Sequence, residues 1–310
     1  MFARVSAIAF NTYREALRAR LLHGLFALAL ATAGYALVVG AFAGRARLRV
    51  VSDLGAASIS LYGIVVAIVL GATSLYRELE LKTIFPILAR PLRRGEYLVG
   101  KFLGIALTLL VFIAADTGAL LIALGPLAGQ SVFVSAAVGL GSVALAGAVA
   151  LKFPRARTGL PIAWALALLV AGTLLSAGAP DDRRVLLGSA FLALLEVGII
   201  SAVASVFSAF SSPFLTAVFT FGVFVVGRSA DTLATLPVNL FGGALRQLGE
   251  FASRILPNLM LYVPERPLLT GEAAGTSLGH YAALAFLHAL GWVAGLLAAA
   301  CLVFRRRDFL

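Results

Sequence analysis

Residues 77–101 read RELELKTIFPILARPLRRGEYLVGK and separate two apolar stretches of membrane-spanning length. The segment carries six basic and three acidic residues, so we do not expect it to lie within hydrocarbon. Leu81, Ile84, Phe85 and Leu88 recur at the spacing of one helical face. The pattern therefore predicts a loop on one face of a bilayer that carries a short amphipathic helix. Such a helix fits a groove on a partner protein.

The composition places the whole chain in a membrane. Of its 310 residues, 61% are hydrophobic and only 13% are charged, and its mean hydropathy is +1.01. A soluble domain carries about 25% charged residues. The net charge of +11 is spread over the loops, which argues against a nucleic-acid surface. The single cysteine, Cys301, allows no internal disulfide, and the three scattered histidines predict no metal site.

The lengths of the apolar stretches predict an all-α polytopic helix bundle. A hydrocarbon core of roughly 30 Å requires about 20 apolar residues in a helix. Eight stretches have this character, although the seventh is short. They are residues 21–44, 54–76, 100–125, 131–152, 159–178, 186–209, 213–229 and 280–304.

The basic residues predict that both termini lie in the cytoplasm. With the N-terminus inside, sixteen of the 25 lysines and arginines fall on the cytoplasmic side, as the positive-inside rule requires. The cytoplasmic segments then include 77–101 and 305–310. The basic turn with Arg45, Arg47 and Arg49 runs against the rule, because this orientation places it outside.

Two segments outside the spans carry amphipathic patterns. In residues 1–20, Phe2, Val5, Ala9, Tyr13 and Ala16 share one helical side and arginines occupy the other, which predicts a helix lying in the membrane interface. In the extracytoplasmic loop 230–279, apolar residues again recur at helical spacing, and the pattern ends at Pro257-Asn258-Leu259. They are Phe241, Leu245, Leu248 and Ile255, and they predict one or two amphipathic helices that rest on the outer membrane face or dip partway into it.

These features together resemble an ABC-2 type transporter permease, the membrane-spanning subunit of such a transporter. The resemblance rests on the loop motif, on the outer Leu256-Pro257-Asn258-Leu259, on Ser211-Ser212-Pro213, and on the tail Arg305-Arg306-Arg307-Asp308-Phe309. The loop motif consists of Glu78, Glu80, Lys82, Thr83, Ile84, Leu88, Arg90, Pro91, Arg94, Gly100 and Lys101. The nearest subgroup comprises permeases linked to maturation of multicopper enzymes such as nitrous oxide reductase.

The resemblance implies a domain plan. Members of the family usually have six spans, so residues 126–185 are interpreted as an insertion of two helices. The plan is an interfacial helix at 1–20, a first transmembrane part at 21–125 with the coupling loop 77–101, the inserted segment, and a second part at 186–310 with the outer loop 230–279. The even number of added helices preserves the orientation of everything that follows.

The resemblance also implies partners and a location. The chain would be no enzyme itself and would hold no cofactor, because two copies of a separate ABC ATPase would bind ATP and magnesium. The permease would pair with a second copy as a homodimer in a bacterial inner membrane, and a periplasmic partner is a further candidate. The residues expected to couple to the ATPase are Glu78, Glu80, Lys82, Thr83, Ile84, Phe85, Leu88, Arg90, Pro91 and Arg94.

Residues 95–102, GEYLVGKF, nearly spell a phosphate-binding loop. The motif requires Ser or Thr after its lysine to ligate magnesium, and here Phe102 follows Lys101. The segment also precedes a predicted span and does not follow a buried strand. Nucleotide binding by this chain is therefore not expected.

Asp116 and Glu196 fall inside predicted spans, where a charge costs several kcal/mol. Both are candidates for transport or a proton relay, and structural hydrogen bonding is the competing interpretation. No basic residue within the spans is expected to pair with them, which favours protonated carboxyls.

Three functions fit the sequence. The first is the permease subunit of an ATP-driven exporter. The second is a secondary transporter that runs on an ion gradient through Asp116 and Glu196, although no internal repeat of the kind found in such folds is evident. The third is a scaffold without transport, or a mechanotransmitter that acts on a periplasmic partner through residues 230–279.

Overall fold

A computed structural model describes residues 2–80, 94–234, 247, 251, 255–272, 275 and 277–305. These residues form helices and connecting turns, and no strand occurs among them. The long helices are α2 (Arg20–Phe42), α3 (Arg47–Glu80), α5 (Arg94–Leu124), α6 (Val132–Lys152), α8 (Pro180–Ser208), α9 (Pro213–Ala234) and α13 (Leu278–Arg305). The shorter ones are α1 (Phe2–Leu17), α7 (Leu160–Leu175), α12 (Arg266–Thr270), and the 3-10 turns η1 (Gly44–Ala46), η2 (Pro154–Thr158) and η3 (Leu259–Tyr262).

The all-α polytopic fold is confirmed. Within the described residues, six helices are long and apolar enough to cross a membrane, namely α2, α3, α5, α6, α8 and α13. The other two predicted spans are apolar helices of shorter length, at Leu160–Leu175 and Pro213–Ser229. Each of the eight predicted stretches is thus helical, while the number that crosses the bilayer stays a prediction.

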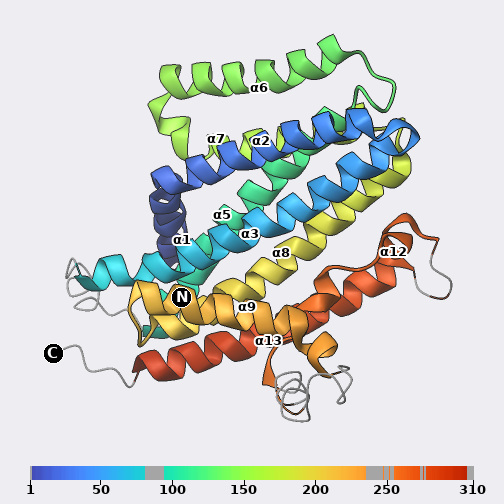
Figure 1. The fold of residues 1–310 in the computed structure, drawn as a ribbon. Coiled ribbons are helices and arrows are strands. Elements are labelled where there is room, and N and C mark those ends of the chain that lie inside the picture. The colour runs from blue at the N-terminus through green and yellow to red at the C-terminus, as the bar shows by residue number, and fades with distance from the viewer. Residues whose placement is uncertain are drawn as a thin grey trace.

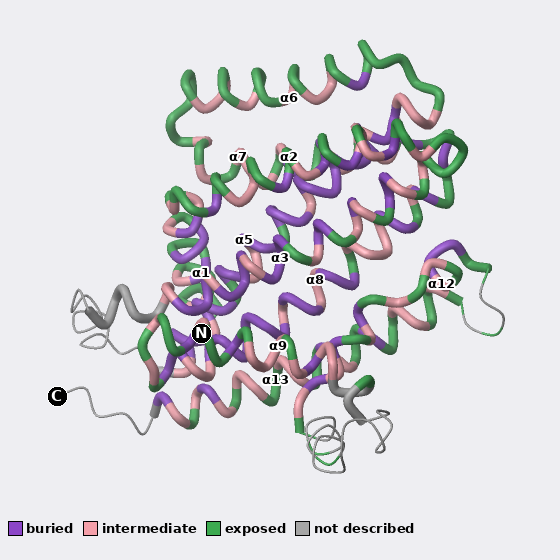
Figure 2. The backbone as a smooth tube through the Cα atoms, viewed as in Figure 1, coloured by how far each residue is buried: buried purple, intermediate pink, exposed green. Residues whose placement is uncertain are grey.

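Helices α3, α5 and α8 form the centre of the bundle (Figure 1). In the most apolar window of α5 and of α8, 67% of residues are buried, against 11% in α13 and 6% in α6. Gly63 of α3 sets the register of the three helices, because a Cβ built there would meet Ile113 of α5 at 3.5 Å and Val197 of α8 at 3.2 Å. Figure 2 shows the same gradient, with buried residues concentrated on the central helices and α6 largely exposed.

Small residues bring α7 close to α5. A Cβ on Gly118 would lie 2.7 Å from the backbone of Leu168 and Leu169, and one on Gly172 would lie 2.7 Å from the Gly118 carbonyl oxygen. Such distances require that neither position carry a side chain, as in the small-residue contacts of membrane helices. The predicted insertion thus divides in two, with α7 packed on the bundle and α6 outside it.

The ends of the bundle agree with the predicted arrangement of the loops. In Figure 1 the N-terminus, the last described residue of α13, and the facing ends of α3 and α5 lie at one end of the bundle, and the α2–α3 turn and α12 lie at the other. The described ends of segment 77–101 and the described ends of α1 and α13 therefore share one side. Whether this side is the cytoplasm stays a prediction from the charge pattern.

The N-terminal helix α1 packs on protein through the side predicted to be apolar. Ala9, Tyr13 and Ala16 are buried, and a Cβ on Gly100 or Gly104 of α5 would collide with Ile8 or Thr12. Phe2, assigned to the same apolar side, is 91% exposed. Burial raises the pKa of the Tyr13 hydroxyl to about 12. Helix α5 thus covers the central part of the predicted apolar side, and the contact of α1 with the membrane interface stays a prediction.

Candidate functional site

The base of segment 77–101 is a packed junction of three helices. Lys101 is 4% exposed, and its ammonium donates to the Ser74 carbonyl oxygen at 2.6 Å and to Ser74 Oγ at 3.2 Å, which joins the start of α5 to the end of α3. The Tyr97 ring stacks on Phe304 of α13, with centroids 6.3 Å apart and planes 17° apart. We call Ser74, Tyr97, Lys101 and Phe304 the loop-base junction.

The predicted coupling residues lie largely outside the described part of the chain. Glu78 and Glu80 belong to the last turns of α3, where only the backbone is described, and Arg94 begins α5. The others lie in residues 81–93, outside the described residues, so their predicted helix is untested. They are Lys82, Thr83, Ile84, Phe85, Leu88, Arg90 and Pro91.

Residues 95–102, which nearly match a phosphate-binding loop, have a different structure. They form the first turns of α5, a helix that follows no strand in the described chain. The Lys101 ammonium, which would reach a phosphate in such a loop, instead donates to Ser74. The geometry is that of a helix anchor.

Glu196 has a basic partner within the bundle, contrary to the prediction. Its side chain is fully buried on α8, and both carboxylate oxygens accept from Arg228 of α9, from Nε at 2.8 Å and from Nη2 at 2.8 Å. Arg228 Nη2 also donates to Ser60 Oγ of α3 at 2.7 Å. The expectation that no basic residue within the spans pairs with Glu196 was wrong, because Arg228 comes from the neighbouring helix and completes a bidentate ion pair.

Asp116 is unpaired among the described residues. It is fully buried, and neither carboxylate oxygen has a hydrogen-bond partner there; the adjacent Thr117 hydroxyl is in the same state. Because α3 and α5 are antiparallel and Ile113 faces Gly63, Asp116 lies at the depth of Ser60. The two intramembrane acids therefore sit at similar depth in different surroundings, one neutralised by an arginine and one not.

A second polar cluster joins three helices at the opposite end of the bundle from the loop-base junction. Arg266 of α12 donates to Asp53 and Ser52 of α3 and to Asp182 of α8. Burial by itself lowers the pKa of Arg266, but the hydrogen bonds to Asp182 and Asp53 outweigh it and raise that pKa above its ordinary value. The cluster holds the guanidinium charged and fixes α12 across the ends of α3 and α8.

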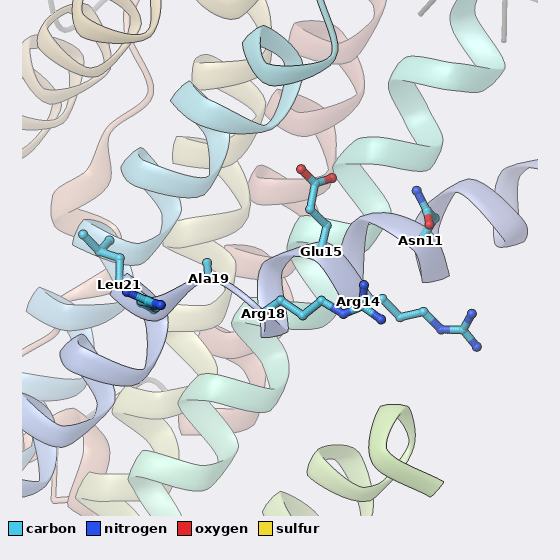
Figure 3. Close-up of a pocket in the computed structure, with 7 residues that line it drawn as sticks. Asn11, Arg14, Glu15, Arg18, Ala19 and Leu21 are labelled. Atoms are coloured by element: carbon cyan, nitrogen blue, oxygen red, sulfur yellow. The ribbon is translucent and has the colours of Figure 1, made fainter. Parts of the chain in front are cut away.

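The connection between α1 and α2 lines an open surface pocket of about 940 Å³ that is rich in arginine. Figure 3 shows Arg14 and Arg18 on one side of the α1 ribbon, with Glu15 directed away from them. Arg20 also lines the pocket. This placement fits the predicted contact of the N-terminal helix with anionic headgroups, because the arginines lie where the chain enters its first apolar helix.

These features define a polytopic membrane protein with a helical bundle, an intramembrane ion pair and a junction that joins the ends of α3, α5 and α13. The chain belongs to the ABC-2 family transporter proteins, whose family model matches residues 6–309. The comparison with curated proteins gives no match. Members of this family are membrane components of transporters that normally work with an ABC ATPase and generally lack a nucleotide-binding site of their own.

The family assignment confirms the resemblance drawn from the loop motif and the tail. It also runs through residues 126–185, so the division into a core and an insertion stays a prediction, as does the subgroup linked to multicopper enzymes. Sequence reasoning missed Arg228, although an arginine inside the apolar stretch 213–229 is the signal that identifies it.

Proposed function

We propose that this chain is the permease subunit of an ATP-driven exporter, which moves its cargo with energy from a separate ABC ATPase that binds ATP and magnesium. The observation that carries this proposal is the loop-base junction. A loop that transmits motion from a partner must be rigidly attached to the transmembrane helices at its ends. Lys101, Ser74 and the stacked Tyr97 and Phe304 supply such a base across α3, α5 and α13.

The proposed coupling runs from the loop into the centre of the bundle. Closure of two ATPase subunits on ATP displaces residues 78–92, and the joined ends of α3 and α5 follow. Because α3 and α5 both pack on α8, a displacement at the loop reaches the buried core directly. Useful work requires that the ATPase favour one of two membrane conformations. Two permease copies would present one loop to each ATPase in a bacterial inner membrane.

The test is association with the ATPase and transport after changing one face of the loop. Leu88→Asp places a charge on the predicted apolar face, whereas Ile87→Asp adds the same charge on another side of the same predicted helix, at a residue outside the predicted coupling set. We expect Leu88→Asp to abolish both co-purification with the ATPase and cargo export, and Ile87→Asp to retain both. If Leu88→Asp retains both, docking through this face is wrong.

Vanadate distinguishes this proposal from an ion-gradient transporter. Vanadate traps ABC ATPases, so export should stop in vesicles that contain the co-expressed ATPase. Export that persists with vanadate but collapses with an ionophore would instead support the gradient-driven alternative. The gradient-driven alternative requires a relay through both Asp116 and Glu196. The structure disfavours such a relay, because Glu196 already pairs with Arg228.

A further inference from the structure

A laterally open cavity of about 290 Å³ lies between α3 and α9, beneath the segment that contains η3 and α12. Its volume corresponds to about ten water molecules. One wall is a stripe of α3 at every fourth residue, Asp53, Ala57 and Leu61, and Phe224 and Arg228 of α9 form the facing wall. Leu61 is 57% exposed, so the cavity reaches the apolar surface of the bundle there.

The positively charged groups near this cavity lie in its lining, whereas most of the acids that pair with them do not. Two guanidinium groups, Arg228 and Arg266, belong to its lining, together with the single acid Asp53. The acids that neutralise the arginines, Glu196 and Asp182, stand behind them and outside the lining, with their side chains 0% and 11% exposed. These five groups carry two positive and three negative charges, but the cavity lining itself holds both positive charges and only one of the negative ones.

Arg228 is held rigidly and still has donors to offer. Its Nε and Nη2 are engaged by Glu196 and Ser60, and its guanidinium carbon lies 5.3 Å from the centre of the Phe224 ring. Nη1 makes no hydrogen bond to any residue that the structure describes. A guanidinium has five N–H donors, and the two on Nη1 remain for a ligand.

The segment above the cavity is fixed to α13. The Tyr262 hydroxyl lies 2.8 Å from His288 Nδ1, and Trp292 Nε1 donates to His288 Nε2 at 3.1 Å. The Tyr281 hydroxyl donates to the Leu261 carbonyl oxygen at 2.6 Å. Arg266 fixes the other end of the segment to α3 and α8. The described walls of the cavity are therefore formed before any ligand arrives, which lowers the cost of binding.

We propose that this cavity binds the acidic headgroup of an amphiphile. A phosphate or carboxylate oxygen accepts from Arg228 Nη1, and the apolar tail leaves along Ala57 and Leu61 into hydrocarbon. An anion is favoured because the lining presents two guanidinium groups against one carboxylate. The amphiphile is either a resident bilayer phospholipid or the exported cargo. Binding itself does not depend on the ATPase coupling proposed above.

The test is binding of phosphatidylglycerol and phosphatidylcholine to the delipidated full-length protein, measured by native mass spectrometry. We expect the wild type to bind phosphatidylglycerol more tightly by at least about tenfold, since a hydrogen bond to a charged group is worth about 1.5–3 kcal/mol. Arg228→Lys keeps the positive charge but lacks the planar fork, and should lose most of this preference. Equal affinity of the wild type for both lipids would overturn the proposal.

A second pair of variants avoids the ion pair. Leu61→Trp fills the mouth of the cavity, and Leu284→Trp on α13 makes the same change at an apolar residue of similar exposure, 53% against 57%, outside the cavity lining. We expect Leu61→Trp to weaken phosphatidylglycerol binding by about tenfold or more, and Leu284→Trp to leave it unchanged. If Leu61→Trp binds as tightly as the wild type, the lipid is not in this cavity.

Transport distinguishes the two sources of the amphiphile. Vesicles containing the permease and its ATPase receive a fluorescent phosphatidylglycerol, and dithionite quenching reports its leaflet. Movement that requires ATP and is lost in Leu61→Trp identifies an amphiphile as cargo. Specific binding without movement identifies a resident lipid. Both results support the binding site. If no ABC ATPase associates with the permease, only the proposed function is contradicted.

Discussion

The Arg228–Glu196 pair permits a quantitative test of how the bundle is held together. Arg228→Met removes both donors from the fully buried Glu196 carboxylate and leaves it with Ser60 Oγ at 3.3 Å. Removing one partner of a buried ion pair costs about 3–5 kcal/mol. Because the Arg228 side chain is 26% exposed and partly screened by water, we expect the lower end, about 3 kcal/mol. That value lowers the ratio of folded to unfolded protein about a hundredfold.

The double variant Glu196→Gln/Arg228→Met isolates the buried charge as the cause. With no charge left to bury, its free energy of unfolding should return to within about 1–2 kcal/mol of the wild type. Reversible unfolding in mixed micelles with increasing SDS, followed by the fluorescence of Trp164 and Trp292, measures both values. The variant Arg184→Met serves as a control.

Arg184 pairs with Asp181 at 3.6 Å on an exposed surface, so its loss should cost less than about 1 kcal/mol. If Arg228→Met costs no more than this control, or if the double variant is as unstable as the single one, the pair does not neutralise a buried charge. The reasoning about the intramembrane network would then be refuted.

Three further outcomes test other contacts. Gly118→Val should lower the free energy of unfolding by about 1–3 kcal/mol, because the added side chain forces α5 away from α7. Gly147→Val should cost far less, since a Cβ there has no neighbour within 4 Å among the described residues. Equal costs for the two variants would contradict the close crossing of α5 and α7. Asp116→Asn should change the unfolding free energy by less than about 1 kcal/mol, because neither carboxylate oxygen has a hydrogen-bond partner among the described residues; a larger loss would reveal a partner. Lys101→Met should cost about 1.5–3 kcal/mol through the lost bonds to Ser74, and a neutral result in the same micelle titration would remove the anchor.

The positions of the helices could be predicted from the sequence, because an apolar stretch of about membrane length is by itself typical of a membrane helix. The eight predicted stretches all contain helices, and small residues at crossings are the expected means of close packing. The sequence did not reveal what covers each apolar stripe. Tyr13 lies on a stripe that suits lipid or protein equally well, and only the positions of Gly100 and Gly104 on α5 decide for protein.

The candidate sites were less predictable because they join residues distant in the chain. Glu196 was identified by its charge, but its partner Arg228 is 32 residues away and Ser60 is 136 away. Arg266 had no local signal, since its partners Asp53 and Asp182 come from the ends of two other helices. Lys101 was recognised as part of a motif, yet its role at the loop base depends on Ser74 at the end of α3.

The isolation of α6 has a consequence for how the protein responds to its membrane. With 6% of its apolar window buried, α6 is held to the rest of the described chain by few contacts, among them the hydrogen bond from Trp164 Nε1 of α7 to Ser142 Oγ at 3.3 Å, and by the turns at its ends. Its tilt and depth should therefore follow bilayer thickness, while α3, α5 and α8 keep their mutual register. Spin labels on α6 and α5 would record this as a separation that changes with acyl-chain length, which makes α6 a gauge of the lipid environment.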